Sequence, residues 1–400
     1  MLFYLYHPPA IKHELPEDAV FSRLRPFDLV KKFFAKGVDK TKKWIIIDDR
    51  PVYHSNHNHN SPMAKARLSD IADLAGVSKA AAGKVLNGGT GKIRVGADAR
   101  KRILDAARKL DYHPNMAATI LAGGSSKLIG VLIDSRAPDS TFRMLAEVER
   151  EADLLGYRIL SAQAHDKPEK LLDSYYSLKQ NGVDGIISFA HDYSHLDCHL
   201  DTRLRDDPKI VYVLNTSEEQ RCSVDVDIPG GMAAAVAHLK AGGYRKPALI
   251  LNLQTFSASS RKRAESFARV CPEGKILTLN ADDTDPADME EQCFDLVGKL
   301  LIPGRFDSVI TFNDYFAAAV MKFLLAEGIR IPDDMGLIGW DNLMFSEFLP
   351  VKLTSVCYDR KAVADTVLNT LLGRINGNTD PVRISIPMNL IPRESTKKEG

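Results

Sequence analysis

The sequence has few cysteines and no long apolar run. Its five cysteines are scattered and never spaced as Cys-x-x-Cys, which argues against a disulfide framework or a zinc knuckle and favours a reducing compartment. No run of about 18 apolar residues occurs, and the first residues lack the basic flank and small-residue cleavage site of a secretory signal. We therefore expect a cytoplasmic protein with no membrane partner.

Positive and negative charges nearly balance over the whole chain, but the positive charges are unevenly distributed. The formal net charge is +1, yet residues 63–125 contain eleven Lys and Arg against five Asp. This segment therefore carries a surplus of six positive charges, which suits a polyphosphate partner such as double-stranded DNA. A solvated basic face without a partner is the alternative that charge alone leaves open.

Residues 1–62 differ from the rest of the chain. They end in the polar string HSNHNHNSP before a second methionine, Met63. The histidines His54, His57 and His59 offer metal ligands, but an Asn/Ser-rich tract is more typical of a flexible linker. We expect this extension to be disordered or a mis-assigned start, with Met63 as the natural first residue.

Short apolar runs alternate with amphipathic stretches from Leu128 onward. The runs are LIGVLI, YRILSA, VDGIISFA, KIVYVLN, PALILNL, KILTLN, SVITFN and MGLIGW. Parallel sheets covered by helices produce this pattern. It predicts an α/β domain over residues 127–400 with two lobes of doubly wound parallel sheet, and a ligand crevice at the carboxyl ends of the strands.

The segment RLSDIADLAGVSKAAAGKVLNG has the layout of a helix-turn-helix. The first helix is predicted to bury Ile71, Leu74 and Ala75. Gly76 permits the left-handed backbone of a tight turn, and Ser78 can cap the second helix. Two helices of an ordinary bundle remain the alternative at this point.

The residues that follow narrow the choice. A third helical stretch leads into Tyr-His-Pro-Asn at residues 112–115, then Ala118 and Leu121, then an Ile-Gly-Val strand. This order, from Leu68 to Val131, resembles the LacI/GalR family of transcriptional repressors. The resemblance implies a small all-α helix-turn-helix head over residues 63–112, followed by a hinge helix and linker over 113–126.

In that family the second helix of the head enters the major groove, and the hinge helix orders on operator DNA. The resemblance implies that Leu121 wedges into the minor groove at the centre of a palindrome. The DNA-binding residues that it implies are Ser78, Lys79, Ala80, Lys84, Asn115, Ala118 and Leu121. Two departures, Gly83 inside the second helix and a longer loop before Val95, put the operator sequence in doubt more than DNA binding itself.

The resemblance continues to the C-terminus, through VDGIISFA, SRKRAESF, VITFNDYFAAAVM and IPDDMGLIGWDN. These strings are similar to the family's effector domain, which is related to type I periplasmic binding proteins. The effector-binding residues that the resemblance implies are Phe142, Tyr193, Arg261, Asn313, Asp341 and Tyr358. Arginine, asparagine and aspartate side chains suit a polyol, because they donate to and accept from adjacent hydroxyl groups, and Phe142 or Trp340 offers an aromatic face for a sugar ring.

The three polar residues of this set also have a structural interpretation. Asn313 and Asp314 could cap a helix, Asp341 could cap a turn, and Arg261 could be a surface cation. Three departures from the family's pattern, Ser266, Ile228 and Trp340, leave the identity of the effector open.

We therefore expect a transcriptional regulator, acting as a repressor, whose affinity for a palindromic operator is controlled allosterically by a small molecule, a carbohydrate. A homodimer is expected, because the C-terminus lacks a heptad repeat that would pair dimers. The alternative is a sugar-binding receptor without DNA regulation, which predicts a signal peptide and no basic head. We find no nucleophile elbow, metal-spaced His/Cys set or dinucleotide fingerprint, so we expect no enzyme activity, cofactor or metal.

Overall fold

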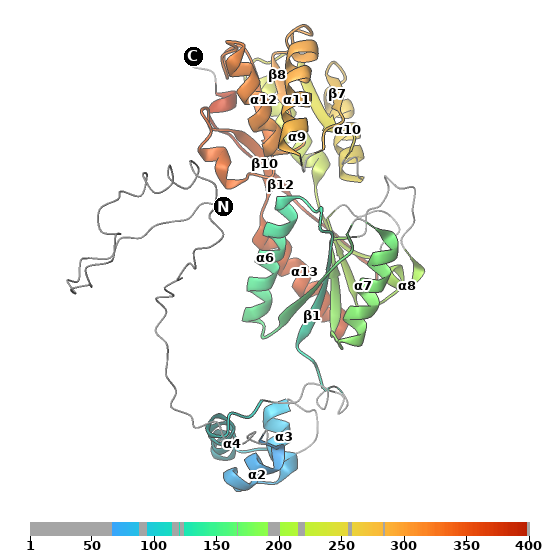
Figure 1. Cartoon of the computed structure of the whole chain (residues 1–400), viewed down its shortest axis with the longest axis vertical. Helices are drawn as coiled ribbons and strands as arrows, with labels where there is room; N and C mark the ends of the chain where they lie inside the picture. Colours follow the sequence, from blue (N-terminus) through green and yellow to red (C-terminus); the bar gives the residue numbers. More distant parts are fainter. Residues whose placement is uncertain are drawn as a thin grey trace, which may run out of the picture. The chain divides into compact units, whose positions relative to one another are not determined.

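A helical head forms the first described part of the chain (Figure 1). It contains α2 (Leu68–Ala75), α3 (Lys79–Asn87) and α4 (Ala97–Lys109). The extension over residues 1–62, with its three histidines, lies outside the described residues. The computed structural model describes residues 66–87, 94–113, 120, 124–165, 167–190, 201–214, 221–254, 258–282 and 285–397.

A small apolar core holds the three helices of the head together. Ile71 and Ile103 are fully buried at its centre, and alanines from all three helices fill the space around them. The expectation that Leu74 is buried was wrong, because its side chain is 46% exposed. Residues 68, 71, 72 and 75 form the buried stripe of α2, and at 100° per residue Leu74 lies beyond the edge of that stripe.

The turn between α2 and α3 has the local geometry that the sequence predicts. Gly76 adopts φ 62°, in the left-handed region, where a Cβ is strained. Ser78 Oγ accepts a hydrogen bond from the Ala81 amide at 3.2 Å and so caps α3. A Cβ at Gly83 would lie 3.3 Å from Leu68 Cδ2, so the absence of a side chain at Gly83 allows α3 to pack closely on α2.

The first lobe is built on a six-stranded sheet in which every neighbouring pair is parallel. In spatial order its strands are β11 (Val382–Ile386), β5 (Cys222–Val226), β4 (Ile210–Val213), β3 (Gly185–Ser188), β1 (Leu128–Ile133) and β2 (Arg158–Gln163). Helices of this lobe are α6 (Asp139–Leu154), α7 (Pro168–Gln180), α8 (Thr202–Arg205) and α13 (Arg360–Ile375). The central strands are buried along their length, as expected for a sheet covered on both faces.

The second lobe repeats this architecture with one antiparallel edge strand. Its sheet runs in the order β12 (Met388–Ile391), β10 (Thr354–Tyr358), β9 (Gly336–Trp340), β8 (Ser308–Ile310), β6 (Pro247–Asn252) and β7 (Lys275–Leu279), with β12 antiparallel to β10. The α-helices are α9 (Ile228–Ala241), α10 (Ala258–Val270), α11 (Pro286–Leu296) and α12 (Asp314–Ala326). A π-helical segment, η2 (Val297–Leu301), and two 3-10 helices, η3 (Met344–Glu347) and η4 (Glu394–Thr396), are also present. The predicted two-lobed α/β class is confirmed.

The chain crosses between the two lobes three times. The crossings follow β5, β10 and β11, so the C-terminal strands return to each sheet in turn. Two of the crossings are tied together where the Asp227 amide donates to the Ile386 carbonyl at 2.8 Å. The crossings begin at the carboxyl ends of β5, β10 and β11, and ligands of open α/β sheets bind beyond the carboxyl ends of the strands.

Two kinds of feature are missing from the described parts of the chain. No helix there has both the length and the apolar character needed to cross a membrane. The same described parts of the chain contain no group of three or more His, Cys, Asp or Glu side chains that could hold a metal ion.

Candidate DNA-binding head and effector crevice

The N-terminal end of α3 presents small and basic side chains to solvent. Ser78, Lys79 and Ala80 are exposed, and Lys84 one turn later is partly exposed. Lysine donates to phosphate oxygens and to guanine acceptors, whereas Ala80 offers only an apolar contact. The predicted DNA-binding residues of the hinge, Asn115, Ala118 and Leu121, lie outside the described residues.

Arg263 on α10 lies at the centre of a polar cluster at the carboxyl ends of β9 and β10. Its guanidinium lies 4.6 Å from the centre of the Trp340 ring, and the charge of Asp341 and the hydroxyl of Tyr358 act on it. Burial lowers the pKa of Arg263 in spite of these neighbours. Its Nε atom is buried and has no hydrogen-bond partner among the residues that the structure describes, so this donor is available to a ligand.

Arg261, the arginine expected at this site, is not part of the cluster. It is exposed, whereas Arg263 shares the inward face of α10 with the buried residues Ser260 and Phe267. The spacing of these three residues, three and then four apart, is the pattern that selects Arg263. The interpretation of Arg261 as a surface cation fits its position.

Asp341 is held in an unusual backbone conformation directly after β9. Its φ is 99°, and that of Asn342 is 48°, and both values are uncommon for residues with a Cβ. The Asp341 amide donates to the Val356 carbonyl at 2.8 Å. Burial raises the pKa of the Asp341 carboxyl, while Arg263 and a hydrogen bond from Ser140 act in the opposite direction.

The two candidate aromatic residues differ in exposure. Trp340 is 1% exposed, and the Arg263 guanidinium lies over its ring, so the idea that Trp340 covers a sugar ring was wrong. Phe142 on α6 is 38% exposed and has a face free to meet a ligand or a second protein. Tyr193 lies outside the described residues.

Asn313 and Asp314 both serve the N-terminus of α12. Asn313 Oδ1 accepts from the Phe316 amide at 2.9 Å, which confirms the capping interpretation of Asn313. Asp314 is fully buried and accepts from donors in the connection between β9 and β10. Sequence reasoning gave Asp314 no role beyond the cap.

Contacts between the lobes flank the cluster. Lys262 on α10 binds Asp225 of β5, with 2.8 Å between Nζ and Oδ2. Tyr315 on α12 hydrogen-bonds to Asp139 on α6, and Ser140 on α6 hydrogen-bonds to Asp341. The elements that carry the cluster therefore touch both lobes, and a change in lobe closure would alter them.

The buried Asp314 makes stability depend on pH. Burial raises the pKa of its carboxyl from 3.8 to about 7, against the hydrogen bonds that it accepts. A folded-state pKa above the unfolded value means that the folded protein holds a proton that the unfolded chain releases between about pH 4 and about pH 7. The stability contributed by this group is therefore present at low pH and lost as the pH rises through about 7.

We expect the melting temperature of the wild type minus that of Asp314→Asn to be larger at about pH 5 than at about pH 8. Thermal unfolding of both proteins across this range measures the difference. A constant difference at all pH values would show that Asp314 does not titrate there.

Two family models match the chain, one in each of its parts. The model of the bacterial regulatory proteins, lacI family, matches residues 67–115, which contain α2, α3 and α4. The model of the periplasmic binding protein-like domain matches residues 236–396. The chain belongs to the LacI family. As a LacI-family member it is a DNA-binding transcriptional regulator.

Relatives of this LacI-family chain match it over nearly their whole length. The HTH-type transcriptional repressor PurR of Haemophilus influenzae (strain PittEE) is 26% identical over 338 residues, which are 83% of this chain and 99% of that protein. The protein of the same name from Vibrio cholerae serotype O1 (strain M66-2) is 27% identical over 341 residues, which are 83% and 98% of the two chains.

Solved structures show the same fold as this LacI-family chain. The Lac repressor dimer bound to operator and the anti-inducer ONPF superposes with a TM-score of 0.69 at 23% identity, covering 83% of this chain and 99% of that one. The transcriptional regulator CelR in complex with cellobiose superposes with a TM-score of 0.55 at 21% identity, covering 83% and 100%.

Proposed function

We propose that this regulator represses transcription from a palindromic operator and that a small molecule bound in the crevice changes its operator affinity. The observation that carries the ligand site is Arg263, whose buried Nε has no hydrogen-bond partner within the described part of the chain and which lies beside the buried carboxylate of Asp341. An unpaired buried donor costs stability, and a ligand group that accepts from it removes that cost.

The chemistry of the cluster supports a neutral, hydroxyl-bearing effector, and we propose a carbohydrate. Arg263 and Asp341 are opposite charges that act on each other, so a ligand with a net charge would leave one of them unmatched. A pair of adjacent hydroxyls can accept from Arg263 and donate to Asp341 at once. Among the structures with this fold, CelR was solved with cellobiose.

Lobe closure provides the route from effector to operator. The effector-site elements contribute contacts on both sides of the crevice, such as Lys262 with Asp225 and Ser140 with Asp341. A ligand that binds one arrangement of the lobes better shifts the population toward it. A coupling of about 1 to 3 kcal/mol would change operator affinity by about 5- to 150-fold.

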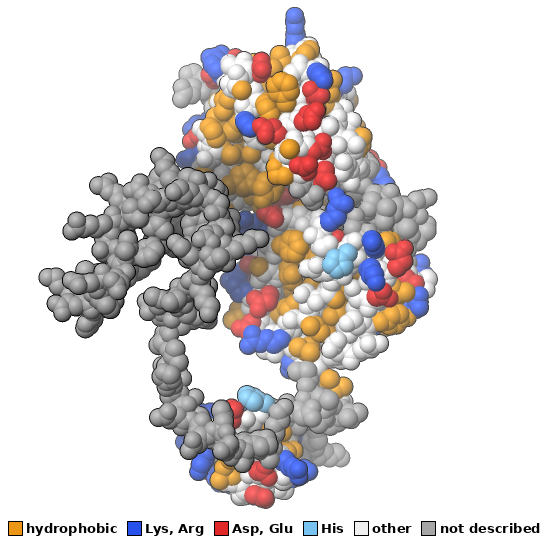
Figure 2. Space-filling model, in the orientation of Figure 1, with side chains coloured by type: hydrophobic (Ala, Val, Ile, Leu, Met, Phe, Trp, Pro, Cys, Tyr) orange, Lys and Arg blue, Asp and Glu red, His pale blue; other side chains and the backbone are white. Residues whose placement is uncertain are grey.

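An exposed apolar surface on the second lobe suits a homodimer. Met344 is 69% and Phe348 79% exposed, and Tyr315 beside them is 40% exposed with its ring 5.0 Å from that of Phe345. We call Tyr315, Met344 and Phe348 the contact face. In the space-filling view, apolar side chains gather on the second lobe (Figure 2). A two-fold dimer would cover the contact face with its own copy and present two heads to a palindrome.

We expect Phe348→Asp to weaken dimerisation by about 30-fold or more, because it places a charge in the apolar centre of the interface. Sedimentation velocity over a concentration series measures the dissociation constant. Ile276→Asp is the matched control, since Ile276 is 39% exposed on β7, an edge strand of the same sheet that is three places from β9 in the strand order. Equal effects of the two substitutions would contradict this assignment of the interface.

The function is tested by titrating the purified protein against palindromes upstream of its own gene, with neutral sugars including lactose and cellobiose and with purine bases as the competing ligand class. We expect sequence-specific binding that one sugar changes by about fivefold or more. A response to purine bases alone would replace the carbohydrate by an aromatic effector. Sugar binding without any specific DNA binding would favour a receptor without DNA regulation.

A further inference from the structure

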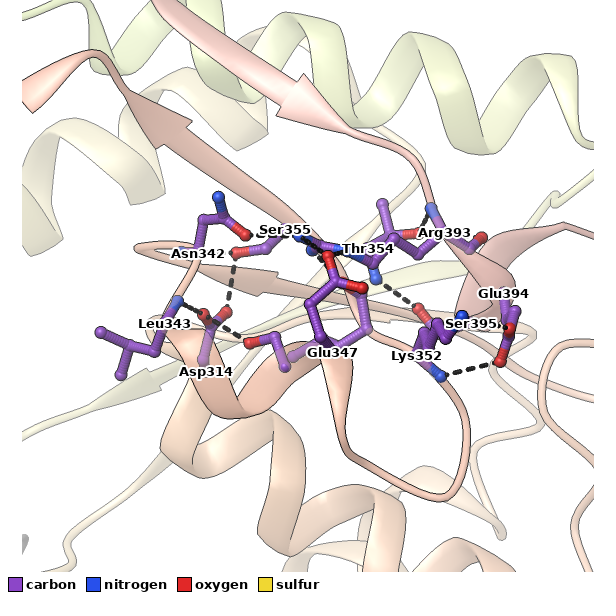
Figure 3. Close-up of polar contacts among 12 residues, drawn as sticks. Asp314, Asn342, Leu343, Glu347, Lys352, Thr354, Ser355, Arg393, Glu394 and Ser395 are labelled. Atoms are coloured by element: carbon purple, nitrogen blue, oxygen red, sulfur yellow. Dashed lines mark hydrogen bonds and ion pairs between the residues drawn. The ribbon is translucent and has the colours of Figure 1, made fainter.

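Asp314 joins α12 to the connection between β9 and β10. Its Oδ2 accepts from the Leu343 amide at 2.6 Å and from Ser346 Oγ at 3.0 Å, and its Oδ1 accepts from Ser355 Oγ at 2.7 Å (Figure 3). All three donors lie in the residues from Leu343 to Ser355, which we call the 343–355 segment. One buried carboxylate therefore fixes both ends of this segment to the first turn of α12.

The same hydrogen bonds support the strained turn that carries Asp341. Ser355 Oγ, which donates to Asp314, also accepts from the Asn342 amide at 3.0 Å. Asp341 and Asn342 both have positive φ, and such conformations persist only where the surroundings over-determine them. Asp314 thus acts on the turn from both sides, through Leu343 and through Ser355.

Arg393 holds the segment from its other side. Its side chain is only 11% exposed and donates to Asn342 Oδ1 at 2.8 Å, to Glu347 Oε1 at 2.6 Å and to the Leu353 carbonyl at 2.7 Å (Figure 3). With Asp314 on one side and Arg393 on the other, the 343–355 segment is positioned as a unit, and a shift at its first residues reaches its middle.

The space around the Asp314 carboxylate is closely filled. A Cβ at Gly339 would overlap Asp314 Oδ1 and would also lie 2.7 Å from Leu353 Cδ2. Glycine on β9 therefore allows the carboxylate to reach the 343–355 segment. Since the carboxylate has no room to move, it transmits a displacement of the segment to α12.

Two surfaces with different proposed roles are joined by this arrangement. Asp341, just before the 343–355 segment, faces Arg263 in the effector crevice. Met344 and Phe348, within the segment, belong to the contact face. Only two residues separate Asp341 from Met344, so the effector residue and the contact face cannot move independently while Asp314 and Arg393 hold the segment.

We propose that Asp314 is a positioning residue that couples effector occupancy of the crevice to the geometry of the contact face. The proposal rests on the proposed function, because it requires an effector at Arg263 and Asp341 and a second copy of the chain at the contact face. An effector that engages Asp341 shifts the turn, and the hydrogen bonds to Asp314 carry the shift to the segment that meets the partner subunit. Asp314 itself contacts neither the effector nor the partner.

The test compares Asp314→Asn with the wild type in the full chain. Asparagine keeps the size of the side chain but places an amide donor against a ring of donors, so at least one hydrogen bond to the segment is lost. The quantity measured is the ratio of operator dissociation constants with and without the panel sugar that affects the wild type most. We expect this ratio to fall toward 1, by about fivefold or more, while the operator affinity of the ligand-free dimer stays within about threefold of wild type.

Asp285→Asn is the matched control. Asp285 precedes α11 and, like Asp314, accepts a hydrogen bond from a backbone amide, that of Ala287 at 2.9 Å. It lies on a different helix from Asp314. We expect it to leave the ratio unchanged. Ser346→Ala and Ser355→Ala remove single donors and test the same coupling should Asp314→Asn fail to fold. A full wild-type ratio in Asp314→Asn, or in both serine variants, would overturn the coupling role alone, whereas a wild type without any effector response would overturn the proposed function and the coupling with it.

Discussion

Replacing Arg263 by alanine is expected to abolish the effector response and leave operator binding intact. The substitution removes a buried donor that has no partner in the described ranges of the chain, and it removes the cation that faces Asp341. Hydrogen bonds to charged groups are worth about 1.5 to 3 kcal/mol, so effector affinity should fall by about 10- to 150-fold. Isothermal titration calorimetry with the responding sugar, and operator binding with and without it, measure the two parts of this expectation.

Arg261→Ala is the control for this experiment. Arg261 and Arg263 lie two residues apart on α10, so the two variants lose the same charge from the same helix. Arg261 is exposed, whereas Arg263 lies in the polar cluster beside Asp341. We expect Arg261→Ala to keep wild-type effector affinity. A loss of effector response in Arg261→Ala with a normal response in Arg263→Ala would show that the arginine first expected from the family resemblance is the ligand contact after all.

Replacing Ile103 by alanine is expected to unfold the head and abolish operator binding. Ile103 is fully buried in a core whose other buried members are Ile71 and alanines, with larger apolar side chains only partly buried around them. An Ile→Ala change in a core costs about 2 to 5 kcal/mol, which is comparable to the whole stability of a domain of this size. Operator affinity should fall to the level of non-specific binding, while effector affinity of the two-lobed domain stays unchanged.

Leu104→Ala is the control for the head, since Leu104 is the next residue of α4 and is 40% exposed. We expect it to keep operator affinity within about threefold of wild type, because surface substitutions rarely exceed about 0.5 kcal/mol. Circular dichroism measures the helix content of Ile103→Ala and Leu104→Ala, and operator titrations measure the DNA affinity of the same two variants. Specific operator binding by Ile103→Ala at wild-type affinity would contradict the account of the head core.

The fold could be predicted from the sequence wherever a strand is long, apolar and buried. Strands β1, β6 and β9 coincide with the runs LIGVLI, PALILNL and MGLIGW to within a residue or two. The strands β5, β10, β11 and β12 were not among the predicted runs. β5 and β10 are buried but contain polar residues that interrupt the apolar pattern. Most residues of β11 and β12 are exposed or half-buried, and their place is set by sheets that form from distant parts of the chain. Tertiary pairing decides such short edge strands.

The head was predictable for a different reason. The Gly76 turn and the Ser78 cap are local devices, so their residue types are sufficient to place them. The buried stripe was less certain, because Leu74 is as apolar as its neighbours and only the packing of α3 and α4 shows that Ala72 is buried in its place.

The polar site depended on geometry that residue types do not encode. Arg263 differs from Arg261 only in the face of α10 that it occupies, and the helix periodicity that separates them was present in the sequence. The positive φ of Asp341 and the contacts of Asp314 with residues about thirty positions away arise only when β9, β10 and α12 are assembled. No local sequence pattern predicts this backbone conformation or these contacts.

The central claim is that one chain reads an operator through its head and a small molecule through its crevice. Fluorescence anisotropy of the purified protein with the palindromes upstream of its gene, at about 50 and about 200 mM salt and with each panel ligand, tests it most directly. The account predicts tight, salt-sensitive, sequence-specific binding that one hydroxyl-bearing ligand changes by about 5- to 150-fold in the wild type and not in Arg263→Ala. Binding that is equal for all DNA sequences, or specific binding that no ligand changes, would contradict it.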